Sequence, residues 1–126
     1  MAEDLDKLIM AAKEARRFAI NSDEGVAMRD STGTVWRSSG ITTADHIVGQ
    51  CAERTALFYA LSNGASEIEM VVIAYEENSA VHPCGACLEA FSRFAPNARI
   101  YLANADRVLG PYGIAELLPA SVGPRS

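Results

Sequence analysis

The chain has 126 residues, 49% of them hydrophobic and 21% charged, with a formal net charge of −5. This length and composition fit one compact domain, so we expect a single domain over residues 1–126. An acidic balance opposes binding to phosphate backbones, which argues against polymeric DNA or RNA as a partner. The apolar runs are short and interrupted by charges, so no segment is expected to cross a membrane.

The first seven residues are acidic where a secretory signal would be basic, and we therefore expect a cytoplasmic protein. The chain has three cysteines, Cys51, Cys84 and Cys87. An odd number cannot pair fully within one chain, and disulfides are rare in the cytoplasm. The three side chains are therefore either buried thiols or metal ligands.

Helix and strand patterns alternate along the chain. Apolar residues at helical spacing predict a helix over residues 3–20. Strands at 25–28 and 34–37 follow, joined by a Gly-containing hairpin turn, and residues 40–50 are expected to form a loop. The later predicted elements are a helix at 51–61, a strand at 68–75, a helix at 84–94, strands at 99–103 and 106–109, and a helical turn at 113–118.

This order of elements indicates an α/β protein. The alternation of strands and helices in the second half predicts a βαβ unit, and the opening hairpin makes the sheet mixed. We expect a three-layer α/β/α fold, in which one mixed five-stranded sheet is covered by helices on both faces. The expected core includes Leu57, Phe58 and Leu61, and both Phe18 and Trp36 are interpreted as packing residues.

Two segments carry the candidate metal ligands, Cys-Ala-Glu-Arg at residues 51–54 and Pro-Cys-Gly-Ala-Cys at residues 83–87. Each lies where a predicted helix begins. Cys84 and Cys87 share one face of a helix, and Cys51 supplies a third thiolate. Three protein ligands leave one tetrahedral position open, which is typical of a catalytic zinc site. We therefore expect one Zn²⁺ per chain, which would lower the pKa of a bound water.

Glu53 lies two residues after the first cysteine, where it can reach the open position without binding the metal. A carboxylate there can move protons between water, a ring nitrogen and a departing ammonia. Zn²⁺ with three thiolates has a formal charge of −1. Arg54 is placed to offset that charge through hydrogen bonds to a ligand sulfur.

The two segments together resemble the signature of the cytidine deaminase family. The run Cys-Ala-Glu-Arg-Thr-Ala-Leu-Phe at residues 51–58 is similar to the small bacterial cytidine deaminases, and Ile-Ala-Glu-Leu-Leu-Pro at 114–119 is similar to the blasticidin S deaminase branch. The likeness extends from about residue 25 to residue 119. It implies the family's fold and a homotetramer whose sites take residues from neighbouring chains.

The resemblance also implies an activity, a zinc-dependent aminohydrolase that converts an amino group on a cytosine-like ring to a carbonyl and releases ammonia. Carried over residue by residue, it makes Cys51, Cys84 and Cys87 the ligands of a catalytic zinc. Glu53 becomes the proton shuttle and Arg54 the charge-balancing residue.

The chain departs from the family pattern in three places. Leu88 and Glu89 follow the second motif where Arg-Gln is usual, which removes a second arginine. The C-terminal segment has no aromatic residue to cover a substrate ring. The loop at 40–46 lacks the Asn-x-Glu-Asn-like stretch that holds ribose. The candidate substrate-binding residues are those of this loop and of the two cysteine motifs with their neighbours: Thr42, Thr43, Asp45, His46, Ala52, His82 and Pro83.

These departures predict that cytidine is a poor substrate and that a free or modified cytosine-like base, or a triazine-type ring, is preferred. Two alternatives stay open. The first is a non-catalytic structural-zinc module, with His46 or His82 as the fourth ligand, that binds a small molecule or a partner chain. The second is a conventional cytidine or deoxycytidine deaminase of pyrimidine salvage. Replacement of Glu53 would separate an enzyme from a binding module.

Overall fold

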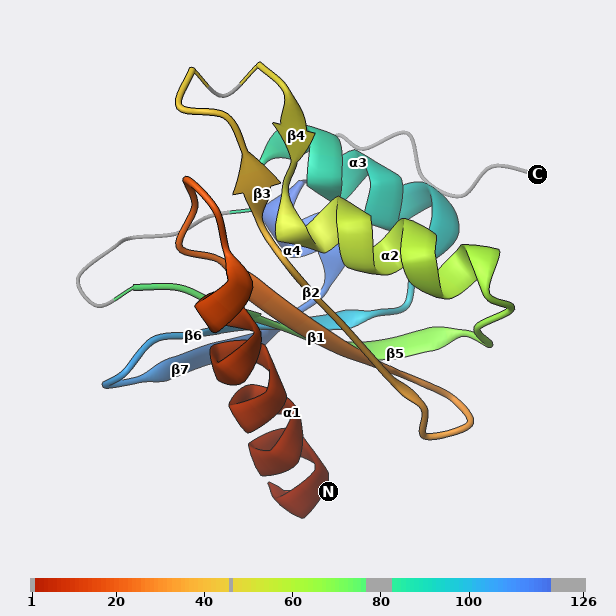
Figure 1. Ribbon diagram of the computed structural model, residues 1–126. Coiled ribbons are helices and arrows are strands. Elements are labelled where there is room, and N and C mark those ends of the chain that lie inside the picture. The colour runs from red at the N-terminus through yellow and green to blue at the C-terminus, as the bar shows by residue number, and fades with distance from the viewer. Residues whose placement is uncertain (1, 46, 77–82, 119–126) are drawn as a thin grey trace.

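The computed structural model of the protein describes residues 2–45, 47–76 and 83–118, and its centre is a five-stranded sheet with helices on both faces (Figure 1). The strand order is β2-β1-β5-β6-β7. The strands of this sheet are β1 Gly25–Asp30, β2 Val35–Ser39, β5 Ile68–Ala74, β6 Arg99–Ala103 and β7 Val108–Tyr112. The helices are α1 Ala2–Ala15, the 3₁₀ turn η1 Arg16–Phe18, α2 Ala52–Ser62, α3 Gly85–Phe94 and α4 Ile114–Leu117.

The pairing of the strands confirms the predicted mixed sheet. Strand β1 pairs antiparallel with both β2 and β5, and β7 pairs antiparallel with β6. Strands β5 and β6 are parallel and are joined through α3, so the predicted βαβ unit is present. Parallel strands need such a crossover, because the chain must return to the same end of the sheet before it can run in the same direction.

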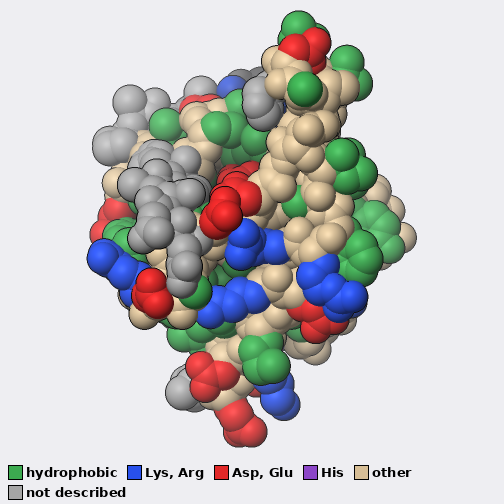
Figure 2. Space-filling view, turned by 60° about the vertical axis from the view of Figure 1, so that its left-hand side comes forward, with side chains coloured by type: hydrophobic (Ala, Val, Ile, Leu, Met, Phe, Trp, Pro, Cys, Tyr) green, Lys and Arg blue, Asp and Glu red, His purple; other side chains and the backbone are tan. Residues whose placement is uncertain are grey.

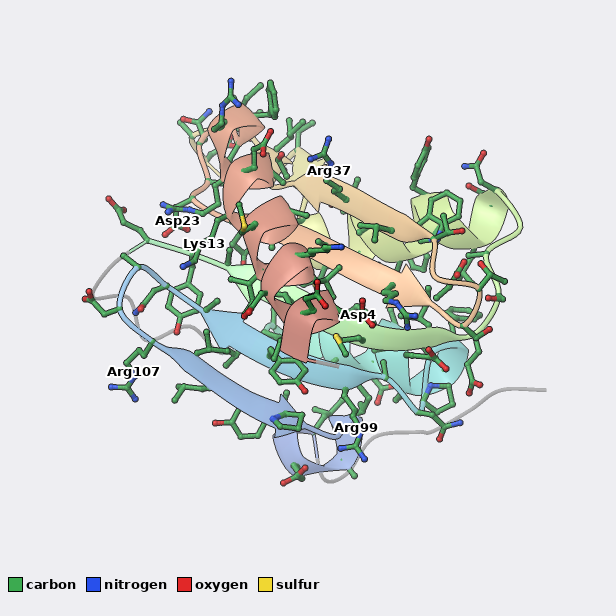
Figure 3. The ribbon with its side chains drawn as sticks, turned by 90° about the horizontal axis from the view of Figure 1, so that it is seen from below. Asp4, Lys13, Asp23, Arg37, Arg99 and Arg107 are labelled. Atoms are coloured by element: carbon green, nitrogen blue, oxygen red, sulfur yellow. The ribbon has the colours of Figure 1, made fainter. Side chains whose placement is uncertain are left out.

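The central strands send alternate side chains into two separate cores, since successive residues of a strand point to opposite faces. On β5, Val71 and Ile73 pack in the core beneath α2 and α3. Val72 and Ala74, between and beside them, pack against α1 on the other face. Figure 3 shows α1 lying across this second face of the sheet. Both faces of β5 are thus covered, in agreement with its apolar sequence.

Asp30 organises the turn between β1 and β2. Its Oδ1 accepts hydrogen bonds from the backbone nitrogens of Thr32 and Thr34, at 2.9 and 3.1 Å, and from the Thr32 hydroxyl at 2.6 Å. Its Oδ2 accepts from the indole nitrogen of Trp36 at 3.2 Å. These donors, with the Thr32 hydroxyl foremost, hold the pKa of Asp30 well below its usual range.

The predicted first helix is too long. It ends as an α-helix at Ala15, and Ile20 lies instead in a bridge with Ile41, where Thr42 N donates to Ile20 O at 3.0 Å. The predicted loop at residues 40–50 is also wrong. It contains a two-stranded hairpin of β3 Ile41–Thr42 and β4 Gly49–Gln50. Sequence periodicity could not reveal strands of two residues, because such strands are too short to show alternation.

Two of the aromatic assignments are also corrected. Phe18 is 64% exposed and Phe58 is 41% exposed, so neither belongs to the core of the chain. Trp36 is half-buried, packs against the main core and meets the ring of Tyr59 edge-on at 5.7 Å. The last strand begins at Val108 and not at residue 106. Within the described ranges, every helix is too short or too polar to cross a bilayer.

The fold predicts a large difference between two Phe→Ala substitutions. Phe91 on α3 is fully buried in the main core, so Phe91→Ala should lower the free energy of unfolding by ~3–5 kcal/mol through lost burial and an unfilled cavity. Phe18→Ala, at an exposed position, should lower it by less than ~1 kcal/mol. Urea unfolding at one fixed protein concentration would measure both, and equal losses would contradict this assignment of the core.

Candidate active site

The three cysteines meet where two helices begin. Cys51 directly precedes α2 and Cys84 directly precedes α3, while Cys87 lies in the first turn of α3. Their three sulfur atoms lie within 4.8 Å of one another. The Sγ atoms of Cys84 and Cys87 are 3.1 Å apart, and the backbone nitrogen of Cys87 donates to the Cys84 sulfur at 3.3 Å. The structure therefore brings together all three residues that the sequence marked as ligands.

The sulfur cluster fits a Zn²⁺ ion by its donor set and by its need for positive charge. Cysteine sulfurs are soft ligands that bind zinc, and three of them converge here. Cys87 is buried and Cys51 is half-buried, and burial is the main cause that raises the pKa of both thiols. A buried thiol becomes a thiolate only when a cation compensates for the lost hydration. The cluster is thus a site that a metal ion would complete.

Arg54 supplies part of that positive charge. It follows the first cysteine by one turn of α2, and its guanidinium forms hydrogen bonds with Cys51 and Cys87. Burial works against the charged form, but the two sulfurs outweigh it and raise the pKa of Arg54. The Nε atom of Arg54 is buried and has no hydrogen-bond partner among the described residues. The predicted position of Arg54 beside the sulfurs is therefore what the structure shows.

Glu53 is a buried carboxylate with an unused oxygen. The residue is 1% exposed, and its Oε1 has no hydrogen-bond partner among the described residues. Burial is the main cause that raises its pKa. A side chain that is buried with an unsatisfied oxygen carries a cost that a purely structural residue would avoid. Such an oxygen is available to a ligand that enters the site.

Glu24, which precedes β1, is a member of this site that sequence reasoning missed. Its carboxyl oxygen lies within 4.8 Å of the Cys51 sulfur and of a Glu53 carboxyl oxygen, and it forms a hydrogen bond with Glu53. Burial, followed by the charge of Glu53, raises the pKa of Glu24 to about 8. The signal available in the sequence is an acidic residue directly before a buried strand.

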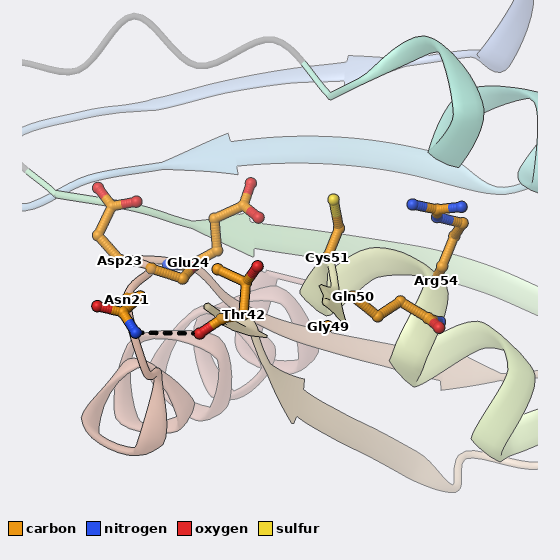
Figure 4. A pocket seen from close by; sticks show the side chains of 9 residues that line it. Asn21, Asp23, Glu24, Thr42, Gly49, Gln50, Cys51 and Arg54 are labelled. Carbon is orange, nitrogen blue, oxygen red and sulfur yellow. Dashed lines mark hydrogen bonds between the residues drawn. The ribbon is translucent and has the colours of Figure 1, made fainter. Parts of the chain in front are cut away.

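A pocket of about 390 Å³ opens beside the sulfur cluster. In Figure 4 the side chains of Asp23, Glu24, Cys51 and Arg54 all point upward from their backbone segments. The residues that line the pocket are Asn21, Ser22, Asp23, Glu24, Thr42, Gly49, Gln50, Cys51 and Arg54. They come from the segment before β1, from the β3–β4 hairpin and from the start of α2.

Some of the predicted substrate-binding residues line the pocket and others do not. Thr42 lines the pocket, whereas Thr43 and Asp45 do not. Thr43 donates its hydroxyl hydrogen to the Asp45 carboxylate, which also accepts from Ile47 N at 3.1 Å. The Thr42 hydroxyl donates to Val48 O at 2.9 Å. These groups are occupied in holding the hairpin together.

The remaining predicted contacts lie along the start of α2 and before α3. Ala52 is buried, and its backbone oxygen accepts a hydrogen bond from the Ser38 hydroxyl at 2.5 Å. Pro83 is also buried, next to Cys84. His46 and His82 lie outside the described residues.

Two named enzymes are similar to this chain in sequence. No protein-family model matches the chain. A protein named cytidine deaminase from Halalkalibacterium halodurans is 32% identical over 123 residues, which cover 94% of this chain and 93% of that protein. Blasticidin-S deaminase from Bacillus cereus is 31% identical over 103 residues, covering 75% of this chain and 73% of that protein.

The fold comparison gives the same result. A crystal structure of cytidine deaminase from Burkholderia pseudomallei matches with a TM-score of 0.81 and 31% identity, and the match covers 92% of this chain and 97% of that one. Similarity in sequence and in fold thus extends over nearly the whole chain. The chain belongs to the cytidine deaminase family.

Proposed function

We propose that this protein is a zinc-dependent hydrolytic deaminase that replaces the amino group of a cytosine-like ring with a carbonyl and releases ammonia. The observation that carries the proposal is the unpartnered, buried Oε1 of Glu53 beside three converging cysteine sulfurs. Relatives named cytidine deaminase and blasticidin-S deaminase support the same reaction class. Residues 1–126 would form one such domain.

Glu53 performs the proton transfers in this reaction. Zn²⁺ held by Cys51, Cys84 and Cys87 would supply an acidified water and a local positive charge. Glu53 takes a proton from the attacking water and gives it to the ring nitrogen next to the reacting carbon. It then takes the remaining proton from the hydroxyl group now on that carbon and passes it to the amino group; the C–N bond breaks, the carbonyl forms and neutral ammonia leaves. Its raised pKa suits a group that must both accept and donate protons near neutral pH.

Arg54 offsets the negative charge of three neighbouring thiolates. The formal charge of Zn²⁺ with three thiolates is −1, and the guanidinium of Arg54 brings the sum to zero. Leu88 and Glu89 stand where a second arginine is usual in the family, and Glu89 is instead paired with Arg93 at 3.3 Å. We infer that Arg54 alone provides the charge balance at the sulfurs.

The preferred substrate is proposed to be a free or modified cytosine-like base and not plain cytidine. A ribose diol is best held by groups that accept and donate several hydrogen bonds. The Thr42 and Thr43 hydroxyl hydrogens are donated to other groups of the hairpin, and Asp45 accepts hydrogen bonds within the same turn. The hairpin thus offers few side-chain donors to a sugar.

We also propose that the enzyme is a cytoplasmic homotetramer. Large apolar side chains remain exposed on α2 and α3, where Phe58 meets Phe94 edge-on at 6.2 Å. The β3–β4 hairpin, which forms the projection at the top of Figure 2, carries further exposed apolar side chains, including Ile47 and Val48. Exposed apolar patches of this kind are typical of subunit interfaces. The three free cysteines are in keeping with a reducing compartment.

The metal site predicts close to one zinc per chain in protein purified without added metal. Cys84→Ala should reduce the zinc content to near zero and lower the thermal stability, because metal binding is coupled to folding. Glu53→Gln is the matched control and should keep its zinc. Elemental analysis measures the metal and a melting curve measures stability. Folded, active protein without zinc would contradict the site.

Removal of the proton shuttle predicts a loss of activity without a loss of metal. Glu53→Gln keeps the shape of the side chain and removes its basicity, so the rate of ammonia release should fall by ~10²–10⁴ or more. Zinc content and circular dichroism should match the wild type. A variant with nearly unchanged turnover would point instead to a binding module with a structural zinc.

The hairpin predicts that cytidine is used poorly. Loss of a hydrogen bond to a charged acceptor costs ~1.5–3 kcal/mol, which corresponds to roughly 10- to 150-fold in affinity. A panel of cytidine, deoxycytidine, cytosine, modified cytosines and amino-triazines, compared by kcat/KM, measures the preference. A kcat/KM for cytidine above ~10⁵ M⁻¹s⁻¹, higher than that of every free base, would identify a conventional cytidine deaminase.

The exposed apolar side chains predict a tetramer that one charge can weaken. Sedimentation at micromolar concentration should show four chains for the wild type. Phe58→Asp should shift the protein to smaller species, because it would bury an unpaired carboxylate in the interface. Phe18→Asp is the matched control, since Phe18 is exposed on η1, and it should leave the mass unchanged. A monomeric wild type would refute the assignment.

A further inference from the structure

Glu24 is a half-buried acidic residue to which the proposed reaction assigns no part. It directly precedes β1 and lines the pocket together with Cys51 (Figure 4). One of its carboxyl oxygens lies within 4.8 Å of a Glu53 carboxyl oxygen, and the two side chains form a hydrogen bond. Two ionised carboxylates are acceptors only and repel each other, so this bond requires that one of the pair keeps a proton.

Glu24 is the neighbour that orients the Glu53 carboxylate. Among the described residues, the hydrogen bonds that act on this carboxylate come from its own backbone and from Glu24. The adjacent Arg54 directs its hydrogen bonds to the sulfurs of Cys51 and Cys87. Burial, followed by the charge of Glu53, raises the pKa of Glu24 to about 8, which agrees with Glu24 as the donor. A bond to its own backbone ties Glu53 only to α2, whereas the bond from Glu24 ties it to the edge of the sheet.

The backbone that carries Glu24 is held on both sides. Its nitrogen donates to the Ser22 hydroxyl oxygen at 3.2 Å, and its carbonyl oxygen accepts from Gly40 N at 3.0 Å. The next residue is Gly25, where a Cβ atom would lie 2.3 Å from the backbone oxygen of Ala12, so α1 packs directly against the beginning of β1. A catalytic group is best fixed by a neighbour whose own position is determined by packing and hydrogen bonds, as that of Glu24 is.

We propose that Glu24 is a positioning residue for the deamination, which donates a hydrogen bond to the Glu53 carboxylate and fixes that group for its proton transfers. The inference rests on the proposed function, because it concerns how Glu53 is held during the same reaction. Glu24 acts through Glu53 and transfers no proton to the substrate itself. Its contribution should therefore appear in kcat, which falls when a reacting group is misplaced, and not in KM.

Two substitutions at position 24 test this role by ammonia release from cytosine and from cytidine. Glu24→Leu removes the donor at similar size, so kcat should fall by ~10²-fold, the cost of misplacing a catalytic group, while KM changes little. Glu24→Gln keeps an N–H donor at the same length and should retain at least ~10 times the kcat of Glu24→Leu, the effect of one hydrogen bond to a charged group. Glu69→Leu, at an exposed position on β5 outside the pocket, is the control and should keep the wild-type kcat.

A double substitution shows whether Glu24 acts through Glu53. Glu53→Gln already lacks the base, so adding Glu24→Leu to it should cause no further loss of kcat. The same fold loss in both backgrounds would mean that Glu24 acts independently of Glu53, and it would overturn the inference. A Glu24→Leu variant with the wild-type kcat, or with its whole defect in KM or in zinc content, would overturn it as well.

Stability measurements test the hydrogen bond without turnover and so separate this inference from the proposed function. In urea unfolding of Glu24→Leu, Glu53→Leu and the double variant, the shifts should not be additive, because the second substitution acts on a bond that is already broken. Additive shifts would overturn the pairing of the two residues. If the wild type releases no ammonia from either compound, the proposed function fails while the unfolding series still tests the pair.

A second variant protects the test against a folding defect. Should Glu24→Leu fail to fold by circular dichroism, Glu24→Asp replaces it in both experiments, because it withdraws the carboxyl group by one methylene and keeps its polarity. Glu24→Asp should then lower kcat relative to Glu24→Gln. Full deaminase activity in Glu24→Asp would overturn the positioning role and leave the deaminase assignment intact.

Discussion

The convergence of three cysteine sulfurs at the beginnings of two helices is the constraint on which the rest of the site depends. Cys51 and Cys84 each occupy the position before a helix, and the Cys84 sulfur accepts a hydrogen bond from the backbone nitrogen of Cys87 in the first turn of α3. The two helices pack on the same face of the sheet, which sets the distance between their starting points. A shift of either helix along the sheet would separate Cys51 from Cys84 and Cys87 and disperse the donor set.

Charged groups surround those sulfurs. Arg54 forms hydrogen bonds with two of the sulfurs, and carboxyl oxygens of Glu24 and Glu53 lie within 4.8 Å of the Cys51 sulfur. Burial disfavours the charged forms of Cys51, Glu24 and Glu53 and is the main cause that raises the pKa of each of them. A divalent cation would reverse that balance, so occupancy of the metal site and the protonation of its neighbours are coupled.

The pocket combines segments that are distant in the sequence. Residues before β1 and the β3–β4 hairpin meet at the Ile20–Ile41 bridge and at the hydrogen bond from Asn21 to Thr42. This contact brings Glu24 next to Cys51, although 26 residues lie between them in the sequence. The hairpin also uses its own threonine hydroxyls internally. The hairpin side of the pocket therefore offers few free hydroxyl donors.

The sequence alone determined the family, the mixed sheet and the sulfur–glutamate cluster. Helical and strand periodicities indicate local backbone preference. The spacing of Cys84 and Cys87, together with the Cys-Ala-Glu-Arg run, indicates metal ligands at the beginnings of two helices. Tertiary structure decided where the first helix ends, that residues 40–50 include a hairpin, and that Phe18 and Phe58 remain exposed. It also decided that Glu24 joins Glu53. Periodicity reports one element at a time, whereas these features arise from contacts between distant segments, which no local pattern encodes.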